Sequence, residues 1–237
     1  MNFSTDSLAG QYSTNENDLN ESMNLRLGRV SSIATGIITT VFAISLIWEM
    51  INLSEFTKNL GYVSSILIAI GVVLMMACFY NVTQKKLKIF GLLALVSSTI
   101  YASLCISVYF LQLSIVASNP LKLTSEVLEI IIFKPGSPTF AIDMLGYCFL
   151  CLSTLAAGFA LRESKDKALR VLCFLHGTLA TPPLFGALMS ELYLSESGEA
   201  DFTGYFVLLF WCIVLIPIAL LFAKYFKEKL LRVNIRA

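Results

Sequence analysis

The residues with the clearest chemical spacing are Cys148 and Cys151, a Cys-x-x-Cys pair of the kind found in thiol oxidoreductases. Such a pair reacts readily at the start of a helix or beside a basic residue, because the helix dipole or the positive charge stabilises the thiolate. Here the pair lies well inside an apolar stretch, with no Lys or Arg next to it. We therefore expect Cys148 and Cys151 to be buried packing residues, and a redox pair is the weaker interpretation.

Four ionisable residues lie within or at the ends of apolar stretches, namely Glu49, Asp143, His176 and Glu191. An ionisable group in a membrane is costly, so each is a candidate for binding a small solute or ion. The competing interpretation places the three acids at the wet outer boundary and bonds His176 to an interior carbonyl or hydroxyl. With a rise of about 1.5 Å per residue, His176 and Glu191 are about 22 Å apart along one helix. Direct pairing of His176 with the acids, and hence a catalytic triad, is not expected.

Small and polar residues also recur at helical spacing around these candidates. One such face comprises Asp143, Gly146, Tyr147, Leu150, Ser153, Thr154 and Ala157, and a second comprises His176, Ala180, Pro183, Ala187 and Ser190, with Glu191 at its margin. Membrane helices pack through faces of this kind, so we expect both to face the bundle interior. The proline pair Pro182–Pro183 and Pro217 predict helix kinks, which could line a cavity or be ordinary packing irregularities.

The elements that must position these residues are membrane-spanning helices. The chain has 237 residues, of which 57% are apolar and 14% charged, whereas soluble domains hold about 45–50% apolar and about 25% charged residues. Unbroken apolar runs of this length predict helices rather than the alternating strands of a membrane barrel. The sequence therefore predicts an all-α bundle of six transmembrane helices, at Val30–Leu53, Leu60–Val82, Ile89–Ser118, Thr139–Leu161, Leu169–Leu194 and Gly204–Phe226.

The remaining segments are polar. Residues 1–29 are rich in Asn and Ser and are expected to form a flexible tail, followed by a transmembrane domain over 30–226 and a basic tail over 227–237. Within the longest connection, Thr124–Phe133 has a capping residue and then mostly apolar residues, which predicts a short helix at the outer interface. The proline- and glycine-rich turn 134–138 then leads into the fourth span.

The basic residues set the expected orientation. With both chain ends on one side, 14 of the 17 Lys and Arg residues fall on that side, and such an excess marks the cytoplasm. We therefore expect a multi-pass protein of the cell (plasma) membrane with both termini cytoplasmic. The basic side favours anionic lipids. The net charge of +1 gives no case for a nucleic-acid partner.

Residues 134–161 resemble a group of uncharacterised prokaryotic multi-pass integral membrane proteins. Those proteins carry a proline- and glycine-rich turn, an aromatic residue, an acid and then Leu-Gly-Tyr at the start of a span. Asp143, Gly146 and Tyr147 match that pattern. The chain departs from it by a second proline in the turn and by its cysteine pair. The resemblance implies a multi-pass helical fold and no particular activity.

Three functions are compatible with this pattern. The first is transport of a small solute or ion between the fourth and fifth spans, with Asp143 and Glu191 as outer polar groups and His176 as an inner protonatable group. The second is a structural, sensory or assembly role exerted through partners, including a second copy of the chain. The third, an intramembrane redox enzyme, has only Cys148 and Cys151 in its favour. No cofactor or metal site is expected, because His176 is the single histidine.

Overall fold

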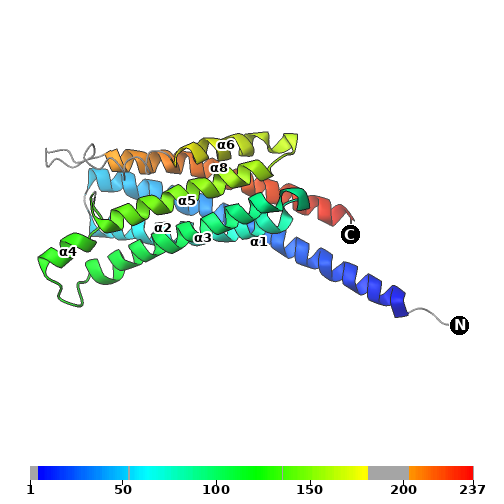
Figure 1. The fold of residues 1–237 in the computed structure, drawn as a ribbon, viewed down its shortest axis with the longest axis horizontal. Helices are drawn as coiled ribbons and strands as arrows, with labels where there is room; N and C mark the ends of the chain where they lie inside the picture. Colours follow the sequence, from blue (N-terminus) through cyan, green and yellow to red (C-terminus); the bar gives the residue numbers. More distant parts are fainter. Residues whose placement is uncertain (1–4, 53, 135, 181–202, 237) are drawn as a thin grey trace.

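Every regular element of the described chain is helical. The computed structural model describes residues 5–52, 54–134, 136–180 and 203–236, and Figure 1 shows their arrangement. The helices are α1 (Thr5–Ile51), α2 (Glu55–Val82), α3 (Lys88–Leu111), α4 (Ser125–Ile131), α5 (Pro138–Ala160), α6 (Lys167–Thr178) and α8 (Thr203–Arg236), with short turns η1 (Lys85–Leu87), η2 (Gln112–Val116) and η3 (Ser164–Asp166). The prediction of an all-α chain is confirmed for these residues.

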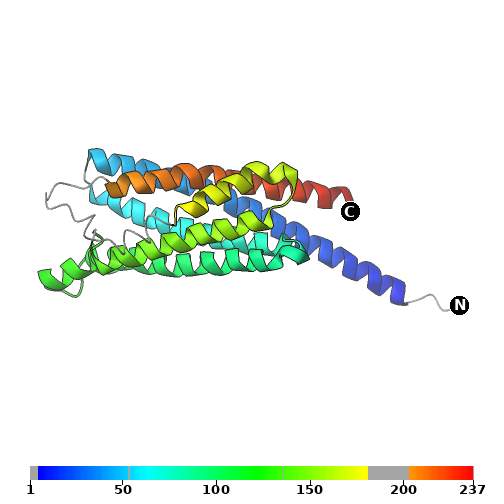
Figure 2. The same cartoon turned by 45° about the horizontal axis from the view of Figure 1, so that its top comes forward.

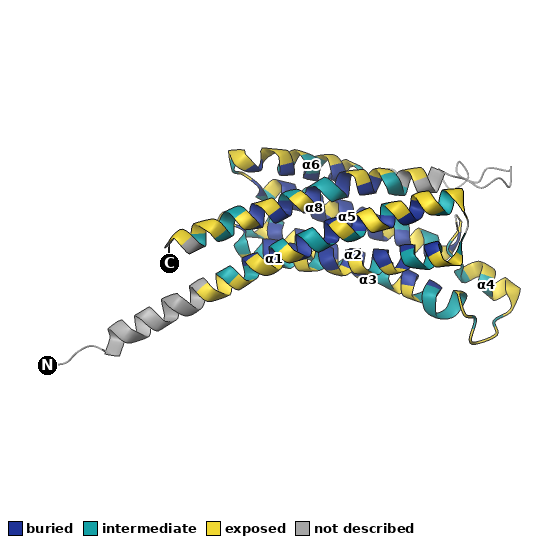
Figure 3. Cartoon of the chain, turned by 180° about the vertical axis from the view of Figure 1, so that it is seen from behind, coloured by how far each residue is buried: buried dark blue, intermediate teal, exposed yellow. Residues whose placement is uncertain are grey.

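Five stretches of the described helices are long and apolar enough to cross a membrane: Leu19–Ile51, Glu55–Val82, Lys85–Val116, Pro138–Ala160 and Leu208–Val233. Their outward faces carry large exposed apolar side chains such as Ile37, Leu92 and Leu220, while the buried residues in Figure 3 lie where the helices face one another. The described helices are therefore consistent with an all-α membrane bundle. The predicted fifth span begins as α6, but its residues 181–194 lie outside the described ranges, so six spans stays a prediction.

The long helices form a closed ring in which consecutive helices are neighbours. The order is α1, α2, α3, α5, α6 and α8, and α8 returns to α1, as Figures 1 and 2 show. Aromatic side chains fill the middle. Phe79 of α2 packs edge-on against Phe222 of α8, with ring centroids 5.3 Å apart, and Tyr147 of α5 stacks on Trp211 of α8 at 4.2 Å.

The first turns of α1 and the last turns of α8 lie at the same end of the bundle, and α4 lies at the other (Figure 1). We name these the terminal end and the α4 end. Ion pairs tie η3 to the terminal end of α8, with Lys165 Nζ 3.7 Å from Glu228 Oε2 and Arg232 Nη1 3.6 Å from Glu163 Oε2. The connection that follows α5 therefore meets the last turns of α8.

Helices α1 and α8 extend into both segments that are expected to form tails. Helix α1 runs from Thr5 without a break, and Leu25 is fully buried. A Cβ on Gly28 would lie 2.7 Å from the ring of Phe226, so this part of α1 is packed rather than free. Helix α8 likewise continues to Arg236, where the pair Lys224–Glu228 joins residues one turn apart. Packing and side-chain pairs thus extend both helices beyond the predicted spans.

Two local predictions can be compared directly. The short helix in the longest connection is confirmed as α4, although the Thr124 side chain makes no capping hydrogen bond. Helix α8 continues through Pro217, and the expected kink there stays a prediction. The Pro182–Pro183 kink lies outside the described residues.

Candidate functional site

Asp143 is held inside the bundle by the way α5 begins. Gly136 has φ 83°, a conformation that glycine adopts without strain. Ser137 then caps the helix, its hydroxyl accepting a hydrogen bond from Phe140 N at 3.2 Å, and Pro138 occupies the first turn. This start turns Asp143 toward α3, where none of its surface is exposed.

The partners of Asp143 are neutral. The hydroxyl of Tyr109 on α3 donates to Asp143 Oδ2 at 2.9 Å, and the thiol of Cys105 also approaches this carboxyl. Asp143 Oδ1 has no hydrogen-bond partner among the described residues. None of the ion pairs formed within the described ranges includes Asp143. Asp143 is therefore enclosed by the packed helices and covered by α3, and its position relative to the membrane boundary stays a prediction.

Close contact between α3 and α5 depends on Gly146. A Cβ there would lie 2.6 Å from Cys105 Sγ and 3.6 Å from the carbonyl oxygen of Tyr101. Deeper along the same contact, Ser153 Oγ donates to the carbonyl of Ala94 at 2.7 Å. The small polar face predicted on the fourth span is buried throughout, as expected: Asp143, Gly146, Tyr147, Leu150, Ser153, Thr154 and Ala157.

A small cavity lies beside this face. It holds about 20 Å³ and is lined by residues of α1, α2, α3, α5 and α8, including Ser65, Tyr101, Tyr147 and Trp211. Ser65 Oγ is fully buried and has no partner among the described residues. A space of this size accommodates one water molecule.

His176 forms a separate buried polar contact. Its Nδ1 lies 2.8 Å from the hydroxyl of Thr154, while Nε2 is buried and has no partner in the described part of the chain. Thr154 follows Asp143 by eleven residues on α5, which is about 16 Å along the helix. The structure therefore places Asp143 against α3 and His176 against α5, and does not bring the two together.

The remaining candidate residues, Glu49, Glu191, Cys148 and Cys151, do not add to these two buried polar contacts. Glu49 is half-buried, two residues before the end of α1, and Glu191 lies outside the described residues. Cys148 and Cys151 are buried free thiols, and Cys148 Sγ donates to the carbonyl of Ala180 at 3.5 Å. Within the described ranges, no group of three or more His, Cys, Asp or Glu residues could hold a metal ion.

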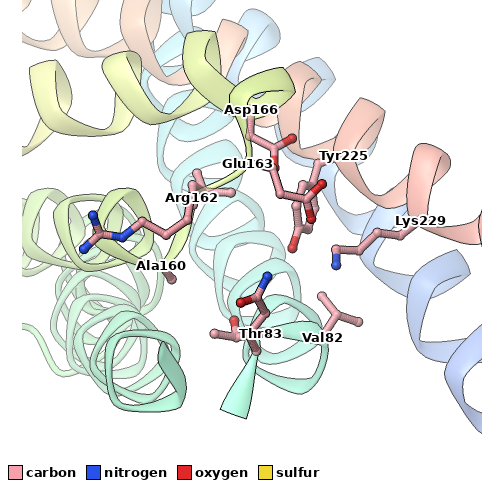
Figure 4. Close-up of a pocket in the computed structure, with 10 residues that line it drawn as sticks. Val82, Thr83, Ala160, Arg162, Glu163, Asp166, Tyr225 and Lys229 are labelled. Atoms are coloured by element: carbon pink, nitrogen blue, oxygen red, sulfur yellow. The ribbon is translucent and has the colours of Figure 1, made fainter. Parts of the chain in front are cut away.

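A second cluster of charged residues lies at the terminal end, around a cleft of about 10 Å³ (Figure 4). Glu163 Oε2 is 3.2 Å from Lys165 Nζ. Burial alone would raise the pKa of Glu163, but the hydrogen bond from Lys165 and the nearby cations outweigh it and lower that pKa. Burial raises the pKa of the neighbouring Asp166. These carboxylates, unlike Asp143, have cations close by.

Sequence reasoning missed Tyr109 and Gln112. Both are buried on the side of the third span that faces α5 and the following loop. Their spacing of three residues in an apolar run is the signal that could have found them, because such residues share one helical face. A pair of polar residues at the end of a span, like an acid within one, therefore indicates a candidate site.

Compared with protein-family models, curated proteins and solved structures, this chain has no match. The resemblance of residues 134–161 to a prokaryotic multi-pass family stays an expectation.

Proposed function

We propose that this protein transports a small ion across the cell membrane, that the ion is a proton, and that Asp143 binds it. The observation that carries the proposal is the state of Asp143, which is fully buried and has one carboxyl oxygen bonded to Tyr109 and the other unpartnered among the described residues. An intramembrane acid with no counter-cation is costly to retain, and such groups mark ion pathways and proton relays.

His176 supports the same proposal. Three buried side-chain atoms in the described chain have no partner, and they belong to Ser65, Asp143 and His176. Two of these residues are the acid and the imidazole expected of a proton path. We assign Asp143 to its outer part and His176 of α6 to its inner part, where His176 lies 2.8 Å from the hydroxyl of Thr154. Thr154 is about 16 Å farther along α5 than Asp143.

The size of the spaces in the bundle favours a proton over a larger solute. The two cavities described above hold about 10 and about 20 Å³, whereas pockets for organic ligands usually hold about 300–1,000 Å³. Proton exchange between hydroxyls, carboxyls and single water molecules needs no larger space.

The orientation and span count belong to this proposal. We infer six spans with both termini in the cytoplasm, because both described ends of the chain lie at the terminal end and the sequence assigns 14 of 17 basic residues to that side. That side would bind anionic lipid headgroups.

The test is a proton-flux assay in liposomes that contain a pH-sensitive dye, with valinomycin and potassium compensating the charge that moves. We expect the wild-type protein to collapse an imposed pH gradient faster than protein-free liposomes do. Asp143→Asn should return the rate to that of protein-free liposomes. A folded Asp143→Asn protein with wild-type flux would refute the role of Asp143, and a wild-type protein without flux would refute proton transport.

A second candidate function is assembly through partners, favoured by the outward face of α3. Of the five spans found in the described ranges, Lys85–Val116 is the least buried within the molecule. Thr99, Ser103 and Ser107 lie exposed there one turn apart, and each hydroxyl donates to the carbonyl four residues earlier. Small residues at this spacing let membrane helices approach closely. Cross-linking at Ser103→Cys in native membranes would test whether another helix lies there.

A further inference from the structure

A second set of contacts covers the Asp143 site from the α4 end. It joins the turn η2, which follows α3, to the connection between α3 and α5. We define residues 119–134 of that connection, which include α4, as the outer strap.

Gln112 holds the strap with both ends of its side-chain amide. Its Nε2 donates to the carbonyl of Ile131 at 2.8 Å, and its Oε1 accepts from the backbone N–H of Phe133 at 2.9 Å. Gln112 is itself 1% exposed, and it begins the π-helical turn η2. Turns of this type are rare and recur at functional sites. The amide thus provides hydrogen-bond partners for the carbonyl of Ile131 and the N–H of Phe133, which lie at and just beyond the end of α4.

Phe133 brings the strap onto the residue that bonds Asp143. Its ring lies 5.9 Å from the ring of Tyr109, 6.4 Å from that of Tyr62 and 5.5 Å from that of Phe140, measured between centroids. Tyr109 in turn donates to Asp143. A continuous path of contacts therefore runs from the strap to the buried carboxyl.

The rest of the strap is lightly attached. Helix α4 has no buried residue, and Val127 and Ile130 are exposed. Tight turns bound the segment, with positive φ at Asn119 and Lys122 on one side and at Gly136 on the other. Segments with few buried contacts open at a lower free energy than the core. The strap therefore depends on a small number of contacts, chiefly those of Gln112 and Phe133.

We propose that the outer strap closes the Asp143 site to the aqueous phase and that Gln112 is the positioning residue that holds it closed. Opening breaks the two amide hydrogen bonds and lifts Phe133 from Tyr109, which exposes the α3–α5 contact to water. If Asp143 binds a proton as proposed, the strap acts as the gate of that site, and this role as a gate rests on the proposed function. The closure itself stands without it.

Cys105 provides a native reporter for the test. It is fully buried and lies against Asp143 beneath Tyr109. A charged, water-soluble methanethiosulfonate reagent is added to the full chain in liposomes, and modification of Cys105 is followed by mass spectrometry of its peptide. We expect slow modification in the wild type. In Gln112→Leu and Phe133→Ala the rate should rise about tenfold or more, because the contacts that oppose opening are lost.

Matched controls come from the same chain. Gln84→Leu changes an exposed glutamine near η1, and Phe110→Ala changes an exposed aromatic residue beside Tyr109; both should leave the Cys105 rate unchanged. If Gln112→Leu does not fold, Gln112→Glu keeps the acceptor for Phe133 N–H and loses the donor, so an intermediate rate is expected. Wild-type rates in both Gln112 variants or in Phe133→Ala, or an equal rise in the controls, would overturn the proposal.

The labelling assay separates the strap from the transport proposal. Faster labelling of Cys105 in Gln112→Leu, together with absent proton flux in the wild type, would support closure and refute transport. Unchanged labelling with flux that depends on Asp143 would refute closure and support transport. Only faster labelling combined with altered flux supports a gate.

Discussion

The two regions of this molecule that contain carboxylates surround them differently: one is exposed and paired with cations, and the other is buried beside neutral groups. At the terminal end, the Glu163 side chain is 36% exposed and lies near Lys165 and Arg232. Toward the α4 end, Asp143 is fully buried, and its partner is the neutral hydroxyl of Tyr109. Cations lie close to the first carboxylate, whereas no described cation forms an ion pair with the second. Exposed ion pairs are common and weakly stabilising, so the uncompensated acid is the better mark of function.

The largest expected effect on stability comes from separating the two helices that bury Asp143. Gly146→Ala should destabilise the protein by about 1–3 kcal/mol, because the new methyl group would overlap Cys105 Sγ. The measurement is unfolding of the purified protein in mixed detergent micelles. Gly36→Ala is the matched control, since its Cβ would meet its nearest atom at 3.5 Å and should fit. Equal losses in the two variants would show that the α3–α5 contact is not specially tight.

A smaller effect is expected from removing the only hydrogen-bond donor that the described chain gives to Asp143 with good geometry. Tyr109→Phe should cost about 1 kcal/mol, since single interhelical hydrogen bonds in membranes are worth about that or less. The same unfolding measurement applies. Tyr80→Phe, at the terminal end, keeps the ring that faces Lys88 and should be neutral. An unchanged free energy of unfolding in Tyr109→Phe would mean that the hydrogen bond from Tyr109 does not stabilise buried Asp143.

The ion pairs at the terminal end should contribute less still. Glu163→Gln should reduce stability by less than about 1 kcal/mol, and the loss should shrink at high salt because exposed pairs are screened. Unfolding at low and at high sodium chloride concentration measures both. A large, salt-independent loss would contradict the contrast between the two regions.

The pH dependence of stability should differ between two neighbouring acids there. Because the pKa of Glu163 is lowered in the folded protein, its contribution is present above the ordinary glutamate pKa and is lost as pH falls through the lowered value. The pKa of Asp166 is raised by burial, so its ionisation costs stability as pH rises past the ordinary aspartate pKa. In Glu163→Gln, the free energy of unfolding should fall less as the pH is lowered. In Asp166→Asn, the loss of stability that accompanies a rise in pH should disappear. A reversed sign in either variant would refute the assignment.

Much of the helical framework follows from hydropathy and from the helical period. The face from Asp143 to Ala157 was predictable because burial on a packed helix follows that period. The depth of Asp143 was not, since its distance from the end of a span does not reveal that α3 and the strap cover it. Gln112 meets Phe133 only through the fold, and Leu25 and Gly28 pack in a segment whose composition indicates a tail. Contacts between distant residues decided each of these cases.

We expect the buried carboxyl of Asp143 to carry the function and the exposed, paired carboxyl of Glu163 to have no part in it. Proton flux into liposomes, compared for Asp143→Asn, Asp143→Glu and Glu163→Gln at equal amounts of folded protein, tests it most directly. The account predicts loss of flux in Asp143→Asn, partial recovery in Asp143→Glu, which retains an exchangeable proton, and wild-type flux in Glu163→Gln. Flux that survives in Asp143→Asn, or that is lost in Glu163→Gln instead, would contradict it.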